Sequence, residues 1–422
     1  MHGRTLISLV LALLIASTIQ AAAPEAQPAT GATWNQWRGP TRDGRVPSPD
    51  WPEALQGDAL QPLWRVAQLA PSYSGPIVSE SLVFTTETKD KSTEIVSALD
   101  RQTGEVRWRV EWPGAISVPF FAKANGDWIR ATPAYDGKFL YVAGMRDILV
   151  CLEAESGHES WRVDFVKELN SPAPDFGFVS SPLVDGDAVY VQAGASVVRL
   201  DKHSGKIIWR TLEDAGGLFG SAFSSPVLAE LHGQRQLVVQ TRQKLAGVDP
   251  ETGEVLWSQV VPSFRGMNIL TPTIVGDAIF TSSYQNKSWL YNIVREQDTF
   301  TVAEAWNNKA QGYMSSPVVV NGYVYLHLGN ERFTCIDLKT GERTWTSTPQ
   351  GKYASLVVQG DRILALNEQG MLLLIRATPE KFELLDSRKV AEADTWAHLA
   401  IVGEELYIRE LQALSAFRWR SP

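Results

Sequence analysis

Residues Ser97–Trp108 read SALDRQTGEVRW, and this stretch decides the fold. An apolar run ends in Asp100, the turn residues Thr103 and Gly104 follow, and a second short run ends in Trp108. Asp and Thr side chains accept N–H groups in turns, and Gly supplies positive φ. The stretch therefore predicts two antiparallel strands joined by a tight turn.

The same skeleton recurs along the chain, with an acidic residue eight positions before a Trp. The five copies are Asp100–Trp108, Glu153–Trp161, Asp201–Trp209, Asp249–Trp257 and Asp337–Trp345. A Trp can bury about 150–250 Å², worth roughly 4–6 kcal/mol as an upper bound, so each is expected to attach its unit to the next. The residues assigned to this structural docking are Asp100, Gly104, Trp64, Trp108, Trp161, Trp209, Trp257, Trp306 and Trp345.

A second marker sets the number of units. It is Ser, Thr or Gly before Pro, with a residue of an apolar-aromatic run eight positions later, as in Pro76 and Phe84. Later copies start at Pro133, Pro182, Pro226, Pro272 and Pro317, and two degenerate copies start at Leu356 and Leu399. The seventh unit lacks the Trp, and we expect Leu385 to replace it. Internal repeats of this kind indicate a ring or solenoid of eight units.

Each unit offers four short strands, except the last. The strand Pro62–Ala67, which carries Trp64, precedes the first unit and is expected to complete the eighth. Closing the ring in this way removes open strand edges. We therefore predict an all-β, eight-bladed propeller of four-stranded antiparallel blades over residues 61–422.

The N-terminus resembles a secretory signal peptide over residues 1–22. Arg4 precedes the apolar run Leu6–Ala16, which is too short to span a bilayer, and small residues follow at Ala21–Ala23. No Cys stands near that site, so a lipid anchor is not indicated. We expect a periplasmic or secreted protein that does not span the membrane.

Residues 23–60 form an irregular leader rich in Pro and Gly. Two interpretations of Trp34, Trp37 and Arg38 stay open: a clasp that packs along the body, which we favour, or a plug that covers a pocket.

Composition and charge limit the classes of partner that we expect. The net charge is −8 and basic residues form no long cluster, so nucleic acid is not expected. The two cysteines, Cys151 and Cys335, fall in equivalent slots four units apart, too distant for a disulfide, and are expected to be buried thiols.

The motif A-x-D-x-x-T-G-x-x-x-W, matched by Ala98–Trp108, resembles the tryptophan-docking motif of PQQ-type β-propellers. The resemblance covers about 360 residues, essentially the whole chain after the leader. It implies either a BamB-like propeller, which assists outer-membrane protein assembly, or a quinoprotein dehydrogenase. The leader Gln36–Gly44 also resembles that of exported PQQ-repeat proteins.

Catalytic and metal-binding motifs are absent from the sequence, so no catalytic or metal-ligating residue is assigned. The links that enter each unit are expected to form a propeller mouth that binds a flat or anionic small molecule or a peptide. Its candidate residues are Tyr73, Trp128, Arg130, Phe178, Phe223, Arg265, Asn268, Tyr313, Lys352, Tyr353, Trp396 and His398.

Three functional hypotheses follow. The first is a non-enzymatic exported scaffold that binds an envelope protein or peptide, acts as a monomer and carries no cofactor. Gene deletion and co-purification of partners would test it. The second is an alcohol or sugar dehydrogenase that uses PQQ with calcium, with Trp128, Arg130 and Trp396 around the cofactor. The third is a glycan- or peptide-binding module on the same face.

Overall fold

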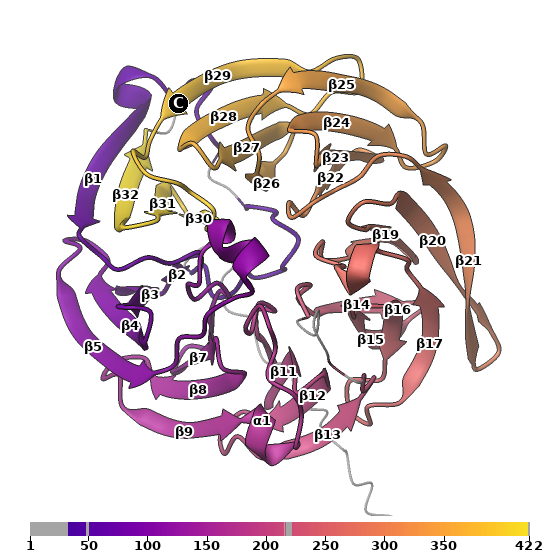
Figure 1. The fold of residues 1–422 in the computed structure, drawn as a ribbon. Coiled ribbons are helices and arrows are strands. Elements are labelled where there is room, and N and C mark those ends of the chain that lie inside the picture. Colours follow the sequence, from indigo (N-terminus) through magenta and orange to yellow (C-terminus); the bar gives the residue numbers. More distant parts are fainter. Residues whose placement is uncertain (1–32, 48–49, 215, 217–221, 421–422) are drawn as a thin grey trace, which may run out of the picture.

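The chain closes into a ring of eight four-stranded antiparallel sheets around a central channel (Figure 1). The computed structural model describes residues 33–47, 50–214, 216 and 222–420. The predicted signal peptide lies outside the described residues. The predicted all-β propeller is confirmed.

Blades one to four follow one another along the chain, each running from its inner to its outer strand. Blade one contains β2 (Ile77–Val78), β3 (Leu82–Lys89), β4 (Thr93–Asp100) and β5 (Val106–Pro113). Blade two contains β6 (Ala134–Tyr135), β7 (Phe139–Gly144), β8 (Ile148–Glu153) and β9 (Glu159–Asp164). Blade three contains β10 (Leu183–Asp185), β11 (Ala188–Ala193), β12 (Ser196–Asp201) and β13 (Ile207–Thr211). Blade four contains β14 (Val227–Leu231), β15 (Gln234–Gln240), β16 (Lys244–Val248) and β17 (Val255–Val260).

Blades five to eight continue the ring. Blade five contains β18 (Thr273–Val275), β19 (Ala278–Ser282), β20 (Ser288–Glu296) and β21 (Thr299–Asn308). Blade six contains β22 (Val318–Val320), β23 (Tyr323–His327), β24 (Arg332–Asp337) and β25 (Arg343–Pro349). Blade seven contains β26 (Ala354–Gln359), β27 (Arg362–Asn367), β28 (Met371–Arg376) and β29 (Glu383–Lys389). Blade eight contains β30 (Ala400–Val402), β31 (Glu405–Glu410), β32 (Ala413–Trp419) and, from the N-terminal side of the chain, β1 (Leu60–Ala67).

The eighth blade is completed by the strand that the sequence predicted. β1 pairs antiparallel with β32 from Leu60 opposite Trp419 to Ala67 opposite Ala413. Backbone hydrogen bonds therefore join the two ends of the propeller, and the ring has no open seam.

The repeated turn has the predicted chemistry. The Asp100 carboxylate accepts the backbone N–H groups of Gln102 and Thr103 at 2.9 and 2.8 Å. Gly104 lies at φ +76°, a conformation that favours glycine. A Cβ at this position would lie only 2.8 Å from the Trp64 ring of the neighbouring blade, so the absence of a side chain leaves room for that ring.

Six tryptophans dock one blade onto the next through the indole N–H. Each donates to a backbone carbonyl of the following blade at 2.8–3.1 Å. These are Trp64, Trp108, Trp161, Trp209, Trp306 and Trp345. Each therefore adds a directional bond to the apolar area that it buries at a blade interface.

Two positions depart from this pattern, and the second corrects a prediction. Trp257 shares a buried cluster with Ile279 and Trp289 of blade five, as its docking role predicts, but it differs from the other six in its hydrogen bond. Its indole N–H donates to Gln236 of its own blade at 2.7 Å, because Gly247 opposite it leaves room for the ring. In blade seven the position of the Trp is held by Asp386 opposite Leu374, and Leu385 is the bulge residue before it. A one-residue bulge precedes the Trp in the other blades as well, which sequence spacing alone did not reveal in a unit without the motif.

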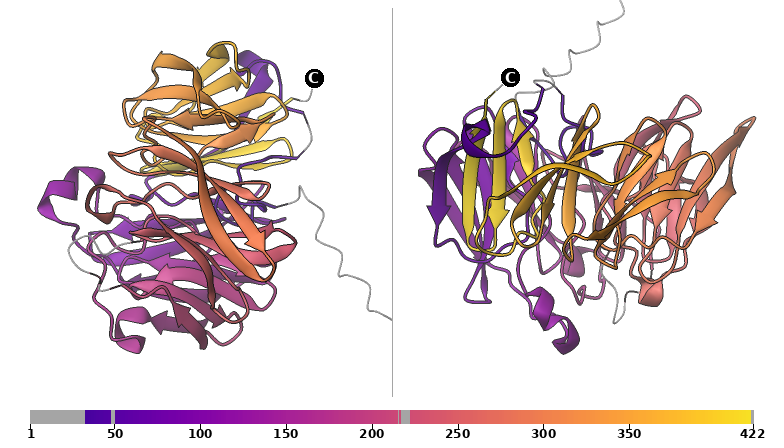
Figure 2. Two further views of the ribbon diagram at one scale, coloured as in Figure 1. Left: turned by 90° about the vertical axis from the view of Figure 1, so that its right-hand side faces the viewer. Right: turned by 90° about the horizontal axis from the view of Figure 1, so that it is seen from above.

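Short helices mark the two faces of the ring. η2 (Phe120–Asn125), α1 (Phe165–Glu168) and η3 (Phe264–Gly266) project from one face, which we call the mouth face (Figure 2). The leader, with η1 (Gly57–Ala59), lies on the opposite face. None of the described helices is long and apolar enough to cross a membrane.

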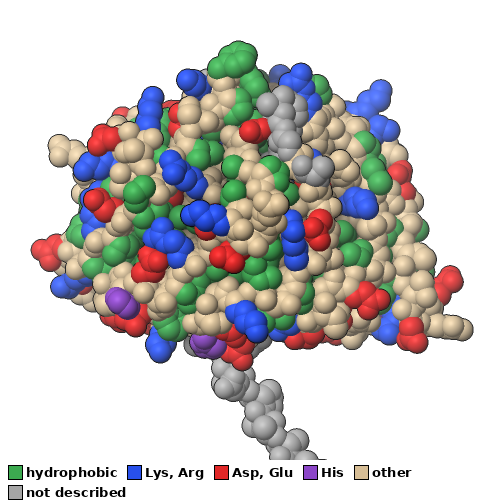
Figure 3. Space-filling view, turned by 60° about the horizontal axis from the view of Figure 1, so that its bottom comes forward, with side chains coloured by type: hydrophobic (Ala, Val, Ile, Leu, Met, Phe, Trp, Pro, Cys, Tyr) green, Lys and Arg blue, Asp and Glu red, His purple; other side chains and the backbone are tan. Residues whose placement is uncertain are grey.

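The outer wall of the ring carries mixed charge. Acidic and basic side chains alternate across the face shown in Figure 3, with small apolar areas between them.

Both cysteines, Cys151 and Cys335, are free and buried, as the sequence predicted.

Candidate functional site

The leader crosses the end of the central channel opposite the mouth. Trp34 exchanges two backbone hydrogen bonds with Val78 of blade one, and Val46 and Gly44 bond to Val358 of blade seven. The leader thus spans the ring between blades that are not consecutive. The plug interpretation holds for this part of the leader.

The rest of the leader packs along blades seven and eight, as the clasp interpretation predicts. Trp51 is 1% exposed and lies edge-on to Trp419 at 5.9 Å. The Asp386 carboxylate accepts the backbone N–H of Leu55 at 2.6 Å. The acid that replaces the docking Trp in blade seven therefore fastens the leader instead of a neighbouring blade.

Two buried arginines of the leader point into the channel. Arg42 donates to the carbonyl oxygens of Ser181 and Pro182 at 3.1 and 2.7 Å, and Arg38 donates to that of Pro317. Burial lowers the pKa of Arg38 to about 10 and that of Arg42 to about 9, so both remain charged at neutral pH. Both guanidinium groups also lie over the Trp37 ring, at 5.5 and 5.7 Å. The channel therefore has a cationic, aromatic floor.

Above this floor, a cavity of about 190 Å³ is lined by two rings of side chains from equivalent positions of the blades. The lower ring holds the residue before each marker Pro. Four consecutive backbone N–H groups in it each donate to a hydroxyl of the next blade at 2.9–3.1 Å. The bonded residues run Gly75, Thr132, Ser181, Ser225 and Thr271. Ser316 and His398 take the corresponding slots in blades six and eight and also line the cavity.

Each residue of the upper ring precedes a residue of the lower ring by two positions in the sequence. Because side chains alternate in an extended chain, both rings point into the channel. Its members in blades one to eight are Tyr73, Arg130, Val179, Phe223, Ile269, Met314, Tyr353 and Trp396. Blades seven, eight and one contribute a continuous aromatic arc: Trp396 stacks on Tyr353 at 5.3 Å and 17°, and lies 5.8 Å from Tyr73. Blades three to six contribute apolar side chains. The cavity is therefore asymmetric, with Arg130 next to the aromatic arc.

Seven of the predicted mouth residues line this cavity: Tyr73, Arg130, Phe223, Tyr313, Tyr353, Trp396 and His398. Trp128 lies beside it, edge-on to Tyr73 at 5.1 Å. Trp37 also lines the cavity, as the plug interpretation of the leader predicted, whereas sequence reasoning missed Met314 and the hydroxyl belt. The Ser/Thr-Pro marker was the available signal for the belt, because it repeats the hydroxyl at one position of every full unit except the first, which has Gly75 there.

The other predicted residues lie elsewhere in the same links. Phe178 is 2% exposed and packs edge-on to Phe165 at 6.2 Å. The Asn268 side chain is buried and donates to the carbonyl oxygens of Thr241, Arg242 and Val261. Lys352 and Arg265 are exposed and do not line the cavity. Phe178 and Lys352 stand directly before the cavity-lining Val179 and Tyr353 but do not line the cavity themselves. The sequence therefore identified the correct links but not which residue of each link faces the cavity.

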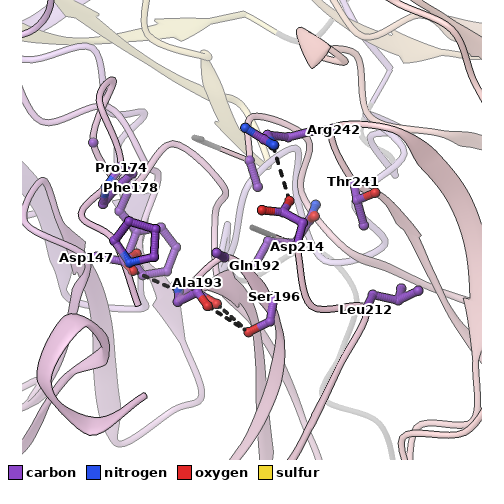
Figure 4. Close-up of a pocket in the computed structure, with 15 residues that line it drawn as sticks. Asp147, Pro174, Phe178, Gln192, Ala193, Ser196, Leu212, Asp214, Thr241 and Arg242 are labelled. Atoms are coloured by element: carbon purple, nitrogen blue, oxygen red, sulfur yellow. Dashed lines mark hydrogen bonds and ion pairs between the residues drawn. The ribbon is translucent and has the colours of Figure 1, made fainter. Parts of the chain in front are cut away.

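A second, smaller pocket is lined by residues of blades two, three and four, with Phe178 in its wall (Figure 4). Its volume is only about 20 Å³, room for one water. Asp147, 3% exposed, lines it and accepts the Gly194 N–H at 2.8 Å. Burial raises the pKa of Asp147 to about 7.

Asp147 should make stability depend on pH. Its folded-state pKa of about 7 exceeds the usual value of 3.8, so the folded state retains a proton that the unfolded state has released. The free energy of unfolding should therefore fall as pH rises from about 4 to about 7. Asp147→Asn should raise it by about 1–3 kcal/mol at pH 8 and little at pH 4. Urea unfolding at both pH values measures this, with Asp187→Asn, an exposed carboxylate, as control. An unchanged slope in Asp147→Asn would contradict the assignment.

Comparison with known proteins follows from this architecture. The fold and channel define a PQQ-type propeller with one end closed by its own leader. The sequence model of a family described as outer membrane protein assembly factor BamB matches residues 92–347, more than half of the chain, and the chain belongs to this family.

Two relatives carry that description. Outer membrane protein assembly factor BamB of Yersinia pestis is 25% identical over 57% of this chain and 64% of its own length. That of Moranella endobia is 21% identical over 71% of this chain and 74% of its own length. The chain therefore spans less than two thirds of the Yersinia relative.

Solved structures show the shared fold. BamB from Moraxella catarrhalis superposes with a TM-score of 0.59 at 16% identity, covering 86% of this chain and 98% of that chain. Quinohemoprotein alcohol dehydrogenase from Comamonas testosteroni gives 0.63 at 12% identity, covering 93% and 82%. The second resemblance raises the question of whether the cavity suits a quinone cofactor.

The cavity lining does not fit PQQ with calcium. PQQ carries three carboxylates on three fused rings. Among the described residues that line the cavity, Arg130 is the one charged side chain, and none carries a carboxylate to bind calcium. The volume of about 190 Å³ lies closer to a benzene-sized cavity of about 150 Å³ than to the roughly 300–1,000 Å³ of larger ligand pockets. A metal ion also finds no ligand set: among the described residues, no group of three His, Cys, Asp or Glu is placed to hold one.

Proposed function

We propose that this protein is an exported, non-enzymatic scaffold that supports assembly of outer-membrane or other envelope proteins from the periplasmic side. The observation that carries the proposal is membership of the BamB family. A closed ring of blades is a rigid platform whose connecting loops can bind a partner without rearrangement of the core. The two blade-joining devices, β1 and the docking tryptophans, supply that rigidity.

The partner surface that we propose is η2 on the mouth face. Phe120 and Phe121 are 85% and 50% exposed, and their rings contact each other edge-on at 5.5 Å. Phe121 continues to Phe176 at 6.3 Å, and Phe176 to Phe223 at the cavity wall at 5.6 Å. Exposed aromatic groups on a soluble protein mark interaction sites. These four phenylalanines, which we call the aromatic ridge, suit an envelope-protein segment that presents apolar side chains before it has folded.

Site-specific crosslinking in the source organism tests this role. A photoreactive residue at position 120 should crosslink to an envelope protein, whereas one at Val106, which is 52% exposed on the outer strand β5, should not. Phe120→Ser should reduce partner recovery at least tenfold without altering the melting temperature, because the Phe120 ring is 85% exposed.

Deletion of the gene tests the proposed scaffold role independently of the crosslinking experiment. The proposal predicts lower amounts of folded outer-membrane proteins, measured by quantitative proteomics and restored by the wild-type gene. An unchanged outer-membrane proteome together with equal crosslinking at positions 120 and 106 would overturn the proposal.

A further inference from the structure

The central cavity combines an apolar aromatic wall with positive charge that no lining carboxylate neutralises. Arg130 donates from Nε to the Trp128 carbonyl at 3.2 Å and from a terminal nitrogen to the Gly126 carbonyl at 2.8 Å. Within the described part of the chain it forms no ion pair with a carboxylate. Buried charge is costly unless it is compensated. A guanidinium held by two carbonyls in this way retains donors for an anion.

The floor of the cavity adds charge of the same sign. Arg38 and Arg42 are 1% and 3% exposed, hydrogen-bond to backbone carbonyls, and lie over Trp37, which lines the cavity. Arg130 in the wall and the two arginines behind Trp37 together create a positive potential in the cavity, in which an anion is favoured.

His398 provides a neutral acceptor in the same cavity. Its Nδ1 lies 3.2 Å from the Leu399 carbonyl, which can only accept, so Nδ1 carries the proton. Nε2 is then an acceptor, and it is buried without a partner in the structure. Desolvation lowers the pKa of His398 to about 3, which keeps the ring neutral. A ligand hydroxyl would satisfy this nitrogen.

The geometry points to a binding site for a small aromatic carboxylate, one planar ring with a single carboxylate, in the central channel. We propose that the ring packs against the arc of Tyr353, Trp396 and Tyr73 while the carboxylate pairs with Arg130. A cavity of about 190 Å³ accommodates one ring with substituents. This inference is independent of the scaffold role, because the cavity lies inside the ring and η2 outside it.

Calorimetric titration of the purified protein tests the site with three probes. Benzoate supplies the ring and the charge, 4-hydroxybenzoate adds a hydroxyl for His398, and benzamide has the shape without the charge. Benzoate should bind at least tenfold more tightly than benzamide, and 4-hydroxybenzoate more tightly than benzoate. Equal binding of benzoate and benzamide, or no binding of either benzoate at 10 mM, would overturn the proposal.

Variants locate the binding. Arg130→Gln should weaken benzoate at least tenfold and leave benzamide unchanged, whereas Arg130→Lys should retain part of the difference. Arg265→Gln, on the same face but outside the cavity, should change nothing. Melting temperatures recorded for all variants show that each remains folded. Tighter binding of PQQ with calcium than of benzoate would also overturn the proposal.

Discussion

Replacing Arg409 with methionine should lower the free energy of unfolding by about 3–5 kcal/mol. Arg409 is 1% exposed on β31 and reaches from blade eight into blade one. It donates to the Ala70 carbonyl at 2.7 Å and the Thr85 hydroxyl at 3.2 Å, and further bonds reach the carbonyl oxygens of Glu410, Ala413 and Thr86. Methionine fills similar volume but leaves these acceptors unpaired.

Two buried carboxylates make the loss more severe. Glu87 and Glu410 are each 1% exposed, and the charge of Arg409 compensates both. Without Arg409, Glu410 keeps Arg65 at 2.6 Å and Glu87 keeps Arg109 at 3.5 Å. Both of these arginines are partly exposed, so the buried carboxylates lose their one buried cationic partner of the described residues. Arg409→Lys keeps the charge but not the planar fork, so it should recover only part of the stability.

Urea unfolding of both variants measures the effect. Arg418→Met serves as control, because Arg418 pairs with Glu405 at the surface with half of its side chain exposed. A loss below 1 kcal/mol in Arg409→Met, or equal losses at positions 409 and 418, would show that the cluster does not stabilise the junction between blades eight and one.

Replacing Trp64 with alanine should lower the free energy of unfolding by about 2–4 kcal/mol, less than a fully buried Trp because the ring is partly exposed. Trp64 is the docking residue of the closing strand β1: its indole N–H donates to the Arg101 carbonyl at 2.9 Å, and its ring lies on Gly104. Its loss weakens the packing of blade eight on blade one, beside the β1–β32 pairing that joins the two ends of the ring. Hydrogen exchange in β1 and β32 should therefore increase more than in blade four.

The same contact can be tested from its other side. A Cβ at Gly104 would lie 2.8 Å from the Trp64 ring, whereas a Cβ at Gly322, also at positive φ, meets no atom within 4 Å. Both Gly→Ala variants carry the backbone cost of positive φ, but only Gly104→Ala adds a clash. Equal losses at the two glycines, or an alanine at position 64 that unfolds like the exposed Leu63→Ala control, would argue against the docking contact.

The sequence by itself determined the ring. The Asp-x-x-Thr-Gly turn and the Trp eight positions after the Asp are local signals, since turn chemistry and strand alternation act within a dozen residues. Repetition then set the number of blades, and the unpaired strand carrying Trp64 revealed the closure. In blade seven, where the local signal is missing, the same reasoning chose Leu385 instead of Asp386.

Only the tertiary structure decided the site. Inward and outward residues of a link differ by a single position, so Tyr353 lines the cavity while Lys352 faces solvent. The path of the leader across the channel, and the cationic floor made by Arg38, Arg42 and Trp37, depend on contacts between residues far apart in the sequence, such as Gly44 with Val358 and Arg38 with Pro317. No local pattern encodes such contacts, because a leader without strand or helix periodicity acquires its conformation from the blades that it touches.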